Sequence, residues 1–112
     1  MYKSNFMVYN LLMGNLLDIR RDYMNINLEY YKIFYHVATE LSITGAAKKL
    51  CISQPAVSQA VKQLEQGLGI ELFTRRAKGV SLTRAGTLLY SYVGNGYETI
   101  LAGETQLAKM MN

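Results

Sequence analysis

The fold is decided by residues 44–69, TGAAKKLCISQPAVSQAVKQLEQGLG, which predict two short helices joined by a tight turn. The second helix is expected to begin after Ser53, a favourable N-cap, with Pro55 in its first turn, where a missing N–H has no cost. Gly69 suits the left-handed residue at which many helices end. The first turns of this helix carry small and polar side chains, so the face that they form is available to a partner.

The first helix of the pair is predicted over residues 43–50, with Ser42 as its N-cap. Ala46 and Ala47 present only methyl groups, so another helix can approach closely at this point. The second helix has an apolar stripe with the spacing of an amphipathic helix, which we expect to face inward. The stripe consists of Val57, Val61, Leu64 and Leu68.

Cys51 and Ile52 form the predicted turn between the two helices. Cys51 is the only cysteine, which excludes an intrachain disulfide. Because its neighbours Leu50 and Ile52 are apolar, we interpret it as a small buried hydrophobe, with a redox-sensing thiol as the alternative. One cysteine and one histidine do not make a metal site, and we expect neither a metal nor a cofactor.

Upstream of the pair, apolar side chains recur at spacings of three and four and predict another helix, with Asn27 as its N-cap. An aromatic stripe of this kind is core far more often than it is a ligand site, and we interpret it as core. It consists of Leu28, Tyr31, Phe34, Tyr35, Ala38 and Leu41. His36 falls off the stripe and is given no role.

Downstream of the pair, residues 72–74 and 80–82 predict two short strands, and the link between them is basic. Arg75, Arg76 and Lys78 lie in this link together with a glycine. Alone, the hairpin would be read as an ordinary solvated one. Because it follows a helix pair, we interpret it as a wing that contacts a polyanion.

Thr83 is the predicted N-cap of a last helix that extends nearly to residue 112. Apolar residues and two glycines follow a heptad spacing along it, which predicts a helix that forms a dimer rather than a lone amphipathic helix. The glycines make this a weak coiled coil unless they allow a close approach. The candidate dimerisation residues are Leu89, Val93, Ile100, Leu107 and Met110, with Gly96 and Gly103 between them.

The charge distribution favours a polyanionic partner. The chain carries a net charge of +4, with a pI of about 9.2. Residues 44–84 hold seven basic and two acidic side chains, so this segment is +5 and the rest of the chain is −1. A solvated basic face would explain the charge by itself. Because the helix pair lies beside it, we favour the interpretation that the basic segment binds nucleic acid.

Enzymatic and membrane functions are not supported. The carboxylates are scattered, no nucleophile is paired with the single histidine, and there is no phosphate-binding glycine loop. We therefore expect that the chain is not an enzyme. It has no run of 18 or more apolar residues, so we expect no membrane-spanning helix and no membrane partner.

DNA recognition fits the residue types. In a helix-turn-helix, the second helix presents its N-terminal residues to the major groove, where glutamine can contact adenine. This geometry directs Gln54, Ser58, Gln59 and Lys62 toward bases. Thr44, Lys48, Arg75, Arg76 and Lys78 would then hold the backbone.

The same residues resemble a known family. They are similar to the N-terminal DNA-binding domain of LysR-type transcriptional regulators. The similar segments are residues 43–50 and 52–65, followed by Leu68-Gly69, Leu72-Phe73, Arg75-Arg76, 80–83 and Ala85-Gly86. The resemblance covers about residues 27–93. Its most specific segment is Ser-Gln-Pro-Ala-Val-Ser at 53–58, and Gly67 departs from it where the family usually has a charged helix former.

The resemblance implies a mainly α fold: a winged helix-turn-helix of three helices and a two-stranded β wing over residues 25–83, then a linker and dimerisation helix over 84–112. It implies a cytoplasmic bacterial homodimer that regulates transcription at an imperfect inverted repeat in promoter DNA. The DNA-binding set becomes Thr44, Lys48, Ser53, Gln54, Pro55, Ser58, Gln59, Lys62, Arg75, Arg76 and Lys78.

Two alternatives to a working regulator remain open. Family members continue into an effector-binding domain, whereas this sequence ends at Asn112, so we expect no small-molecule effector site in this chain. The chain would then be a fragment, a truncated product or a short form that acts by itself. It could act as a dominant-negative dimerisation partner of longer relatives, or as a small non-specific DNA-binding protein.

Residues 1–24 differ in character from the rest and are interpreted as an N-terminal extension. Arg20-Arg21 followed closely by Met24 is what an in-frame, purine-rich ribosome-binding site would encode. We therefore hypothesise that Met24, rather than Met1, is the physiological start.

Overall fold

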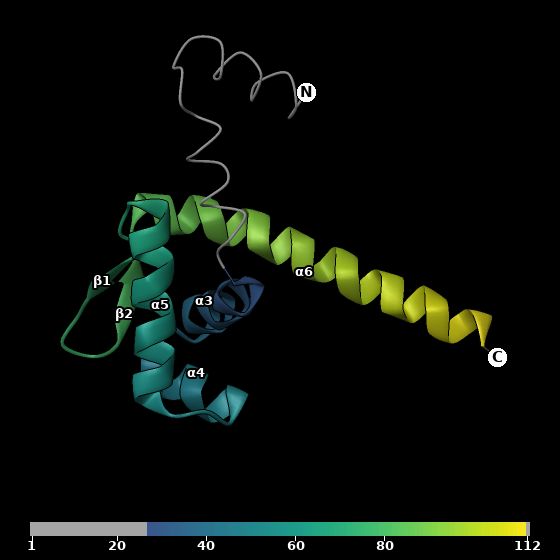
Figure 1. Cartoon of the computed structure of the whole chain (residues 1–112), viewed down its shortest axis with the longest axis horizontal. Coiled ribbons are helices and arrows are strands. Elements are labelled where there is room, and N and C mark those ends of the chain that lie inside the picture. Colours follow the sequence, from purple (N-terminus) through teal and green to yellow (C-terminus); the bar gives the residue numbers. More distant parts are fainter. Residues whose placement is uncertain (1–26, 112) are drawn as a thin grey trace, which may run out of the picture.

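The computed structural model describes residues 27–111. In chain order they form α3 (Leu28–Glu40), α4 (Ile43–Leu50), α5 (Gln54–Leu68), β1 (Phe73–Arg75), β2 (Val80–Leu82) and α6 (Arg84–Met110). This arrangement of three helices, a two-stranded hairpin and a long last helix confirms the predicted fold class (Figure 1). The hypotheses on residues 1–24 and on Met24 lie outside the described residues.

Each of the four helices begins at a side-chain N-cap that the sequence predicts. A cap oxygen accepts a hydrogen bond from a backbone N–H of the first turn, which has no partner within the helix. The bonds join Asn27 to Glu29 at 2.8 Å, Ser42 to Gly45 at 2.9 Å, Ser53 to Ala56 at 3.2 Å and Thr83 to Gly86 at 3.0 Å. Gly69 ends α5 in the left-handed conformation with φ 74°, also as predicted.

Helix α3 lies at the centre of the fold, where it packs against α4, α5 and α6. Phe34 and Val37 are fully buried in it, and the ring of Phe34 lies 5.4 Å from the ring of Phe73. From the other elements, Val57, Leu64 and Leu72 complete the group of fully buried large side chains. The core therefore joins the helix pair to the base of the wing.

The predicted apolar stripe on α3 is partly wrong. Leu28 is 80% exposed and Leu41 is 47% exposed, because Leu28 begins the helix at its free end and Leu41 is the left-handed C-cap where the chain turns away. Ile33 and Val37 are buried instead. Three neighbouring helices cover more of the surface of α3 than one stripe.

The interpretation of Cys51 as a buried residue is also wrong, because its side chain is exposed. Cys51 is the C-cap of α4 and has a left-handed backbone, φ 58°, with its N–H bonded to the last turn of the helix. The reversal of the chain directs its Sγ to the surface, 3.8 Å from the carbonyl oxygen of Lys48. Ala46 and Ala47 occupy the interior in its place.

The wing is an antiparallel hairpin in which Phe73 pairs with Leu82 and Arg75 with Val80. Its first strand begins and ends one residue later than predicted, so Arg75 belongs to β1 rather than to the link. The Leu72 N–H donates to the carboxylate of Glu65 on α5. At the base of the wing, the Thr83 N–H donates to the Leu72 carbonyl oxygen at 3.0 Å.

The returning strand of the wing is attached to the turn between α3 and α4. The Val80 N–H donates to the carbonyl oxygen of Leu41 at 3.1 Å. The preceding Gly79 has φ 88°, and a Cβ there would overlap the same carbonyl oxygen. Only glycine allows the two segments to approach this closely.

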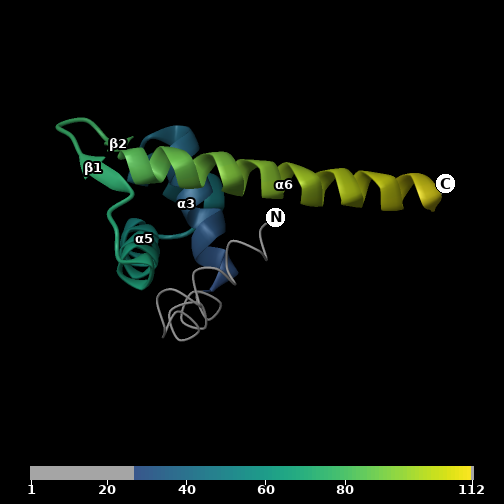
Figure 2. The same ribbon diagram turned by 90° about the horizontal axis from the view of Figure 1, so that it is seen from above.

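Helix α6 extends far beyond the rest of the domain (Figures 1 and 2). Its first half packs against α3 and β2, and every residue from 98 to 111 is exposed. We refer to residues 98–110 as the arm.

We predict that Gly86→Ala destabilises the domain by about 1–3 kcal/mol, the usual range for overpacking. Gly86 is buried in the first turn of α6, where a Cβ would overlap the Leu72 carbonyl oxygen and lie 2.9 Å from Cδ2 of Leu82. Urea unfolding followed by circular dichroism measures the effect.

Gly96→Ala is the matched control in the same helix, because a Cβ there meets nothing of its own chain within 4 Å. Both variants are compared at protein concentrations low enough to keep the chain monomeric, since Gly96 is also a position of the predicted dimer seam. It should stabilise the helix by about 0.5–1 kcal/mol, since alanine is the better helix former. Equal effects of the two substitutions would contradict the close contact at Gly86.

Candidate nucleic-acid interface

Helices α4 and α5 form the helix-turn-helix that residues 44–69 predict. The two helices pack against each other, and the small residues Ala46, Ala47 and Ala60 are all buried. At the turn, the Ile52 N–H donates to the Ala47 carbonyl oxygen at 3.1 Å. The turn therefore fixes the start of α5 relative to α4.

Helix α5 has two faces of different character. Val57, Ala60, Val61 and Leu64 are buried against the core. On a second face beside the buried one, Gln54 and Lys62 are exposed, and Ser58 between them is half-buried. Spacings of four place these three side chains along one row.

The other residues predicted for the helix pair also lie at the surface. Gln59 is exposed next to the row, and Pro55 is exposed in the first turn of α5. Ser53 is exposed as well, and its hydroxyl oxygen already accepts the hydrogen bond that caps the helix. Thr44 and Lys48 are exposed on α4. The predicted DNA-binding residues of α4 and α5 thus all lie at the surface, and only Ser58 is half-buried.

The wing lies at the same end of the molecule as α5, and the arm points away from both (Figures 1 and 2). Arg75, Arg76 and Lys78 are all exposed on it. Nε of Arg76 donates to Oγ of Ser81 across the hairpin at 2.9 Å, which holds the guanidinium group beside the second strand. The wing and α5 can therefore face one partner together.

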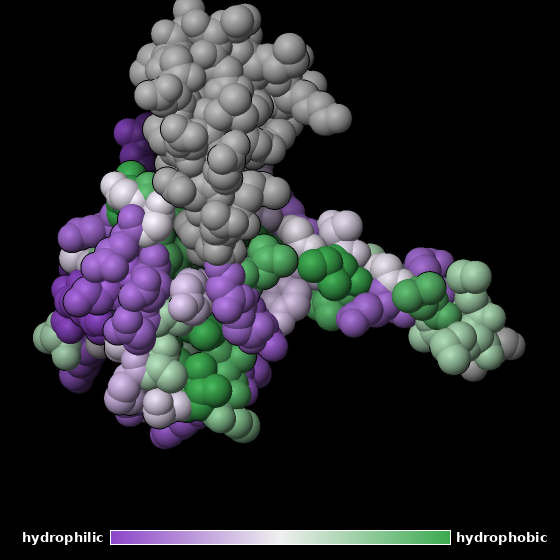
Figure 3. All heavy atoms as spheres, viewed as in Figure 1, coloured by the Kyte–Doolittle hydropathy of each residue, from purple (hydrophilic) through white to green (hydrophobic). Residues whose placement is uncertain are grey.

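The basic groups of this end are available to a polyanion. Across residues 27–111 the one ion pair joins Lys32 to Glu29 on α3, at 3.7 Å. None of the basic residues predicted to contact DNA is therefore paired with a described carboxylate. Figure 3 shows hydrophilic side chains gathered over α5, on the face turned to the viewer.

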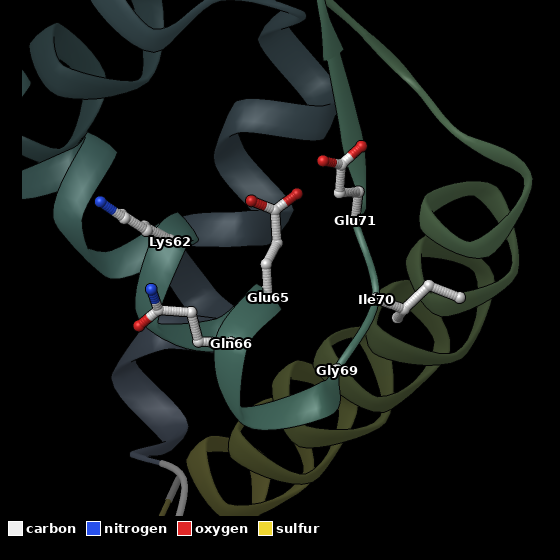
Figure 4. A pocket seen from close by; sticks show the side chains of 6 residues that line it. All are labelled: Lys62, Glu65, Gln66, Gly69, Ile70 and Glu71. Carbon is white, nitrogen blue, oxygen red and sulfur yellow. The ribbon is translucent and has the colours of Figure 1, made fainter.

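Glu65 is a site residue that the sequence analysis missed. Its Oε2 accepts hydrogen bonds from the N–H groups of Leu72 and Phe73, at 2.6 and 3.2 Å. Figure 4 shows the side chain directed from α5 toward the segment that leads into β1. Glu65 thereby ties the wing to the helix. An acidic residue within a basic segment was the available signal, but its partners are backbone groups that no sequence pattern marks.

The hollow in Figure 4 is a shallow, open depression beside the end of α5. It is lined by Lys62, Glu65, Gln66, Gly69, Ile70 and Glu71. It does not enclose a small molecule. Within the described part of the chain, no three His, Cys, Asp or Glu side chains are grouped so as to hold a metal ion.

The five predicted dimerisation residues fall into two groups. Leu89 and Val93 are half-buried and pack against the core of their own domain. Ile100, Leu107 and Met110 lie on the arm and are 64%, 61% and 81% exposed. Only the side chains of the second group expose most of their surface, so only they could pack against another chain.

Comparison with known proteins identifies the family. Residues 28–87 match the family described as "Bacterial regulatory helix-turn-helix protein, lysR family". The chain is 48% identical over 65 residues to the transcriptional regulator BudR of Klebsiella aerogenes, covering 58% of this chain and 46% of BudR. It is 41% identical over 86 residues to the regulator CbbR of Rhodospirillum rubrum, covering 77% of this chain and 28% of CbbR. The chain thus spans less than half of the length of these relatives.

Solved structures agree with the sequence comparison. The complex of the BenM DNA-binding domain with catB site 1 DNA matches with a TM-score of 0.61 and 35% identity, over 76% of this chain and 91% of that one. The complex of the CbnR DNA-binding domain with DNA matches with a TM-score of 0.66 and 27% identity, over 77% and 99%. The expectation that the chain is not an enzyme agrees with these matches. From its sequence and its fold, the chain belongs to the lysR family of bacterial regulatory helix-turn-helix proteins.

Proposed function

We propose that this chain binds double-stranded promoter DNA sequence-specifically, with α5 in the major groove and the wing on the phosphate backbone or in the minor groove. The observation that carries the proposal is the division of α5. One face is buried in the core, and the other presents Gln54, Ser58 and Lys62 in a row. The solved BenM and CbnR domains are similar in fold and are bound to DNA.

The exposed side chains suggest a division of roles. Gln54, Ser58, Gln59 and Lys62 are directed at base edges, which carry the sequence information. Thr44 and Lys48 on α4, with Ser53 and Pro55 at the start of α5, hold the phosphate backbone. The N–H groups at a helix N-terminus favour an anion there. Arg75, Arg76 and Lys78 of the wing bind the backbone on the other side of α5.

The chain acts as a homodimer in this proposal. Residues 25–83 form the DNA-binding domain, and residues 84–112 form the linker and dimerisation helix. Ile100, Leu107 and Met110 leave apolar surface exposed along the arm. Figure 3 shows hydrophobic side chains at several places along α6. A Cβ at Gly96 or Gly103 would meet nothing within 4 Å, so a second helix has room to approach. A symmetric dimer suits an imperfect inverted repeat.

The place of action is the cytoplasm, where promoter DNA is found in bacteria. No helix across residues 27–111 is long and apolar enough to cross a membrane.

Footprinting on promoter DNA separates the proposal from its alternatives. A discrete protected site with two half-sites supports the regulator, whereas uniform protection would indicate a non-specific binder. Recovery of this chain only in complex with a longer family member would indicate a dominant-negative partner.

Gln54→Ala and Arg76→Ala should weaken DNA binding in different ways. Loss of Gln54 should cost about 1–3 kcal/mol and relax the preference at one base position, because a base contact is lost. Loss of Arg76 should weaken binding to all sequences alike and reduce the salt slope by about one unit, because a phosphate contact is lost. Anisotropy titrations with duplexes selected from a random library measure both. If Gln54→Ala weakened every sequence equally, α5 would not be the reading helix.

Glu65→Ala should reduce the contribution of the wing without changing that of α5. Removing the carboxylate leaves the N–H groups of Leu72 and Phe73 without their acceptor, so the wing loses its fixed position. A double-mutant cycle on DNA affinity should give non-additive effects with Arg76→Ala and additive effects with Gln54→Ala. Gln66→Ala, at the exposed next position of α5, should be additive with both. Additivity of Glu65→Ala with Arg76→Ala would contradict the link.

Leu107→Asp should weaken the dimer by placing a charge in its apolar seam. Sedimentation equilibrium measures the dissociation constant, which we expect to rise by at least about tenfold for a buried, unpaired carboxylate. Leu101→Asp is the matched control, since Leu101 is 52% exposed on the arm but lies outside the heptad positions. An unchanged dimer in Leu107→Asp would show that the arm does not form the interface.

A further inference from the structure

Four aromatic side chains join α3 to α6. Tyr35 and His36 belong to α3, and Tyr90 and Tyr97 belong to α6. The ring of Tyr35 stacks on Tyr90 with centroids 5.5 Å apart and meets Tyr97 at 5.0 Å. His36 meets Tyr97 edge-on at 6.2 Å. We refer to these four residues as the aromatic clamp.

Further contacts restrict how the clamp can move. The hydroxyl groups of Tyr90 and Thr39 are hydrogen-bonded at 3.0 Å, and Thr39 also donates to the Tyr35 carbonyl oxygen at 2.9 Å. Gly94 lies in α6 between the clamp residues Tyr90 and Tyr97, and a Cβ there would be 3.5 Å from the Tyr35 ring. The ring therefore lies close to the backbone of α6. Together, these contacts restrict the angle between the axes of α3 and α6.

The environment of the clamp favours the neutral form of its histidine. Burial lowers the pKa of His36 below its ordinary value of 6.5, and the nearby Lys32 and Lys49 lower it further against a smaller opposing effect of Glu40. This shift favours the neutral imidazole over the charged one. A neutral ring packs against Tyr97 without the desolvation penalty of a charge.

The clamp lies where α6 leaves the domain. Tyr97 is half-buried, and the arm that begins at the next residue is exposed throughout. Thirteen helical residues from 98 to 110 span roughly 20 Å at about 1.5 Å per residue. Tilting the arm by about 10° would displace its end by roughly 3.5 Å, which is close to the rise of one base pair.

We propose that the aromatic clamp sets the spacing between the two DNA half-sites that a dimer of this chain recognises. The inference rests on the proposed DNA-binding dimer. Two chains joined through their arms carry their α5 helices on rigid domains, so the angle at each clamp fixes the distance between those helices along DNA. Tyr97 is then a positioning residue, which acts on DNA only through the orientation of α6.

The test compares the full chain with Tyr97→Ala and with Tyr97→Phe, which keeps the ring. The probes are duplexes that carry two copies of the half-site selected by the wild type from a random library, with the spacing varied in steps of one base pair. A duplex with one half-site measures reading by a single domain. Anisotropy titrations give the affinity for each probe.

The wild type should prefer one spacing and bind at least about tenfold more weakly two base pairs away, since DNA resists the required distortion. Tyr97→Ala should lose this preference, with less than about threefold difference across the series, while binding one half-site within about twofold of the wild type. Tyr97→Phe should restore the preference. Unchanged half-site binding also shows that the variant is folded.

Three results would overturn the inference, and they differ in what else they affect. If Tyr97→Ala kept the spacing preference of the wild type, the clamp would not set the spacing, although the DNA-binding dimer would stand. If the wild type bound two half-sites with no preference for any spacing, both the dimer and the inference would fail. Loss of one-half-site binding in Tyr97→Ala would overturn it too, because Tyr97 would then be needed for reading itself.

Discussion

The burial of α3 is the interaction on which the rest of the structure depends. Phe34 and Val37 are inaccessible to solvent, and α3 packs against α4, α5 and α6 alike. Burying a large apolar side chain contributes about 1.5–3 kcal/mol, so these few residues supply much of the stability of a small domain. The polar face of α5 can remain outward because its apolar face is fixed here. A change in α3 would therefore reach the helix-turn-helix, the wing and the arm together.

Sequence patterns predicted the features of the fold that depend on neighbouring residues. The four N-caps and the glycine at the end of α5 involve contacts within a few positions, and all five were predicted. The errors arose where the chain reverses or where several elements converge. Cys51 and Leu41 were assigned to the interior by their apolar character, but both have left-handed backbones at helix ends. Ile33 was missed because one periodic stripe cannot show that α3 has three neighbours.

The candidate site was predictable to a similar extent. Periodicity separates the two faces of α5, so the outward residues could be named from the sequence alone. The role of Glu65 could not, because its partners are backbone N–H groups seven and eight residues away. The heptad pattern of α6 likewise could not distinguish Leu89, which its own domain covers, from Ile100, which remains exposed. Both distinctions depend on packing between distant segments.

The hydrogen bond between Arg76 and Ser81 has a thermodynamic consequence for recognition. A free arginine side chain has many rotamers and loses up to about 2 kcal/mol of conformational entropy when it is immobilised. Because Nε of Arg76 is already bonded to Oγ of Ser81, part of that ordering takes place during folding. In the proposed complex with DNA, the remaining guanidinium N–H groups would meet a phosphate in a restricted orientation. Association would then lose less entropy than with an unrestrained side chain.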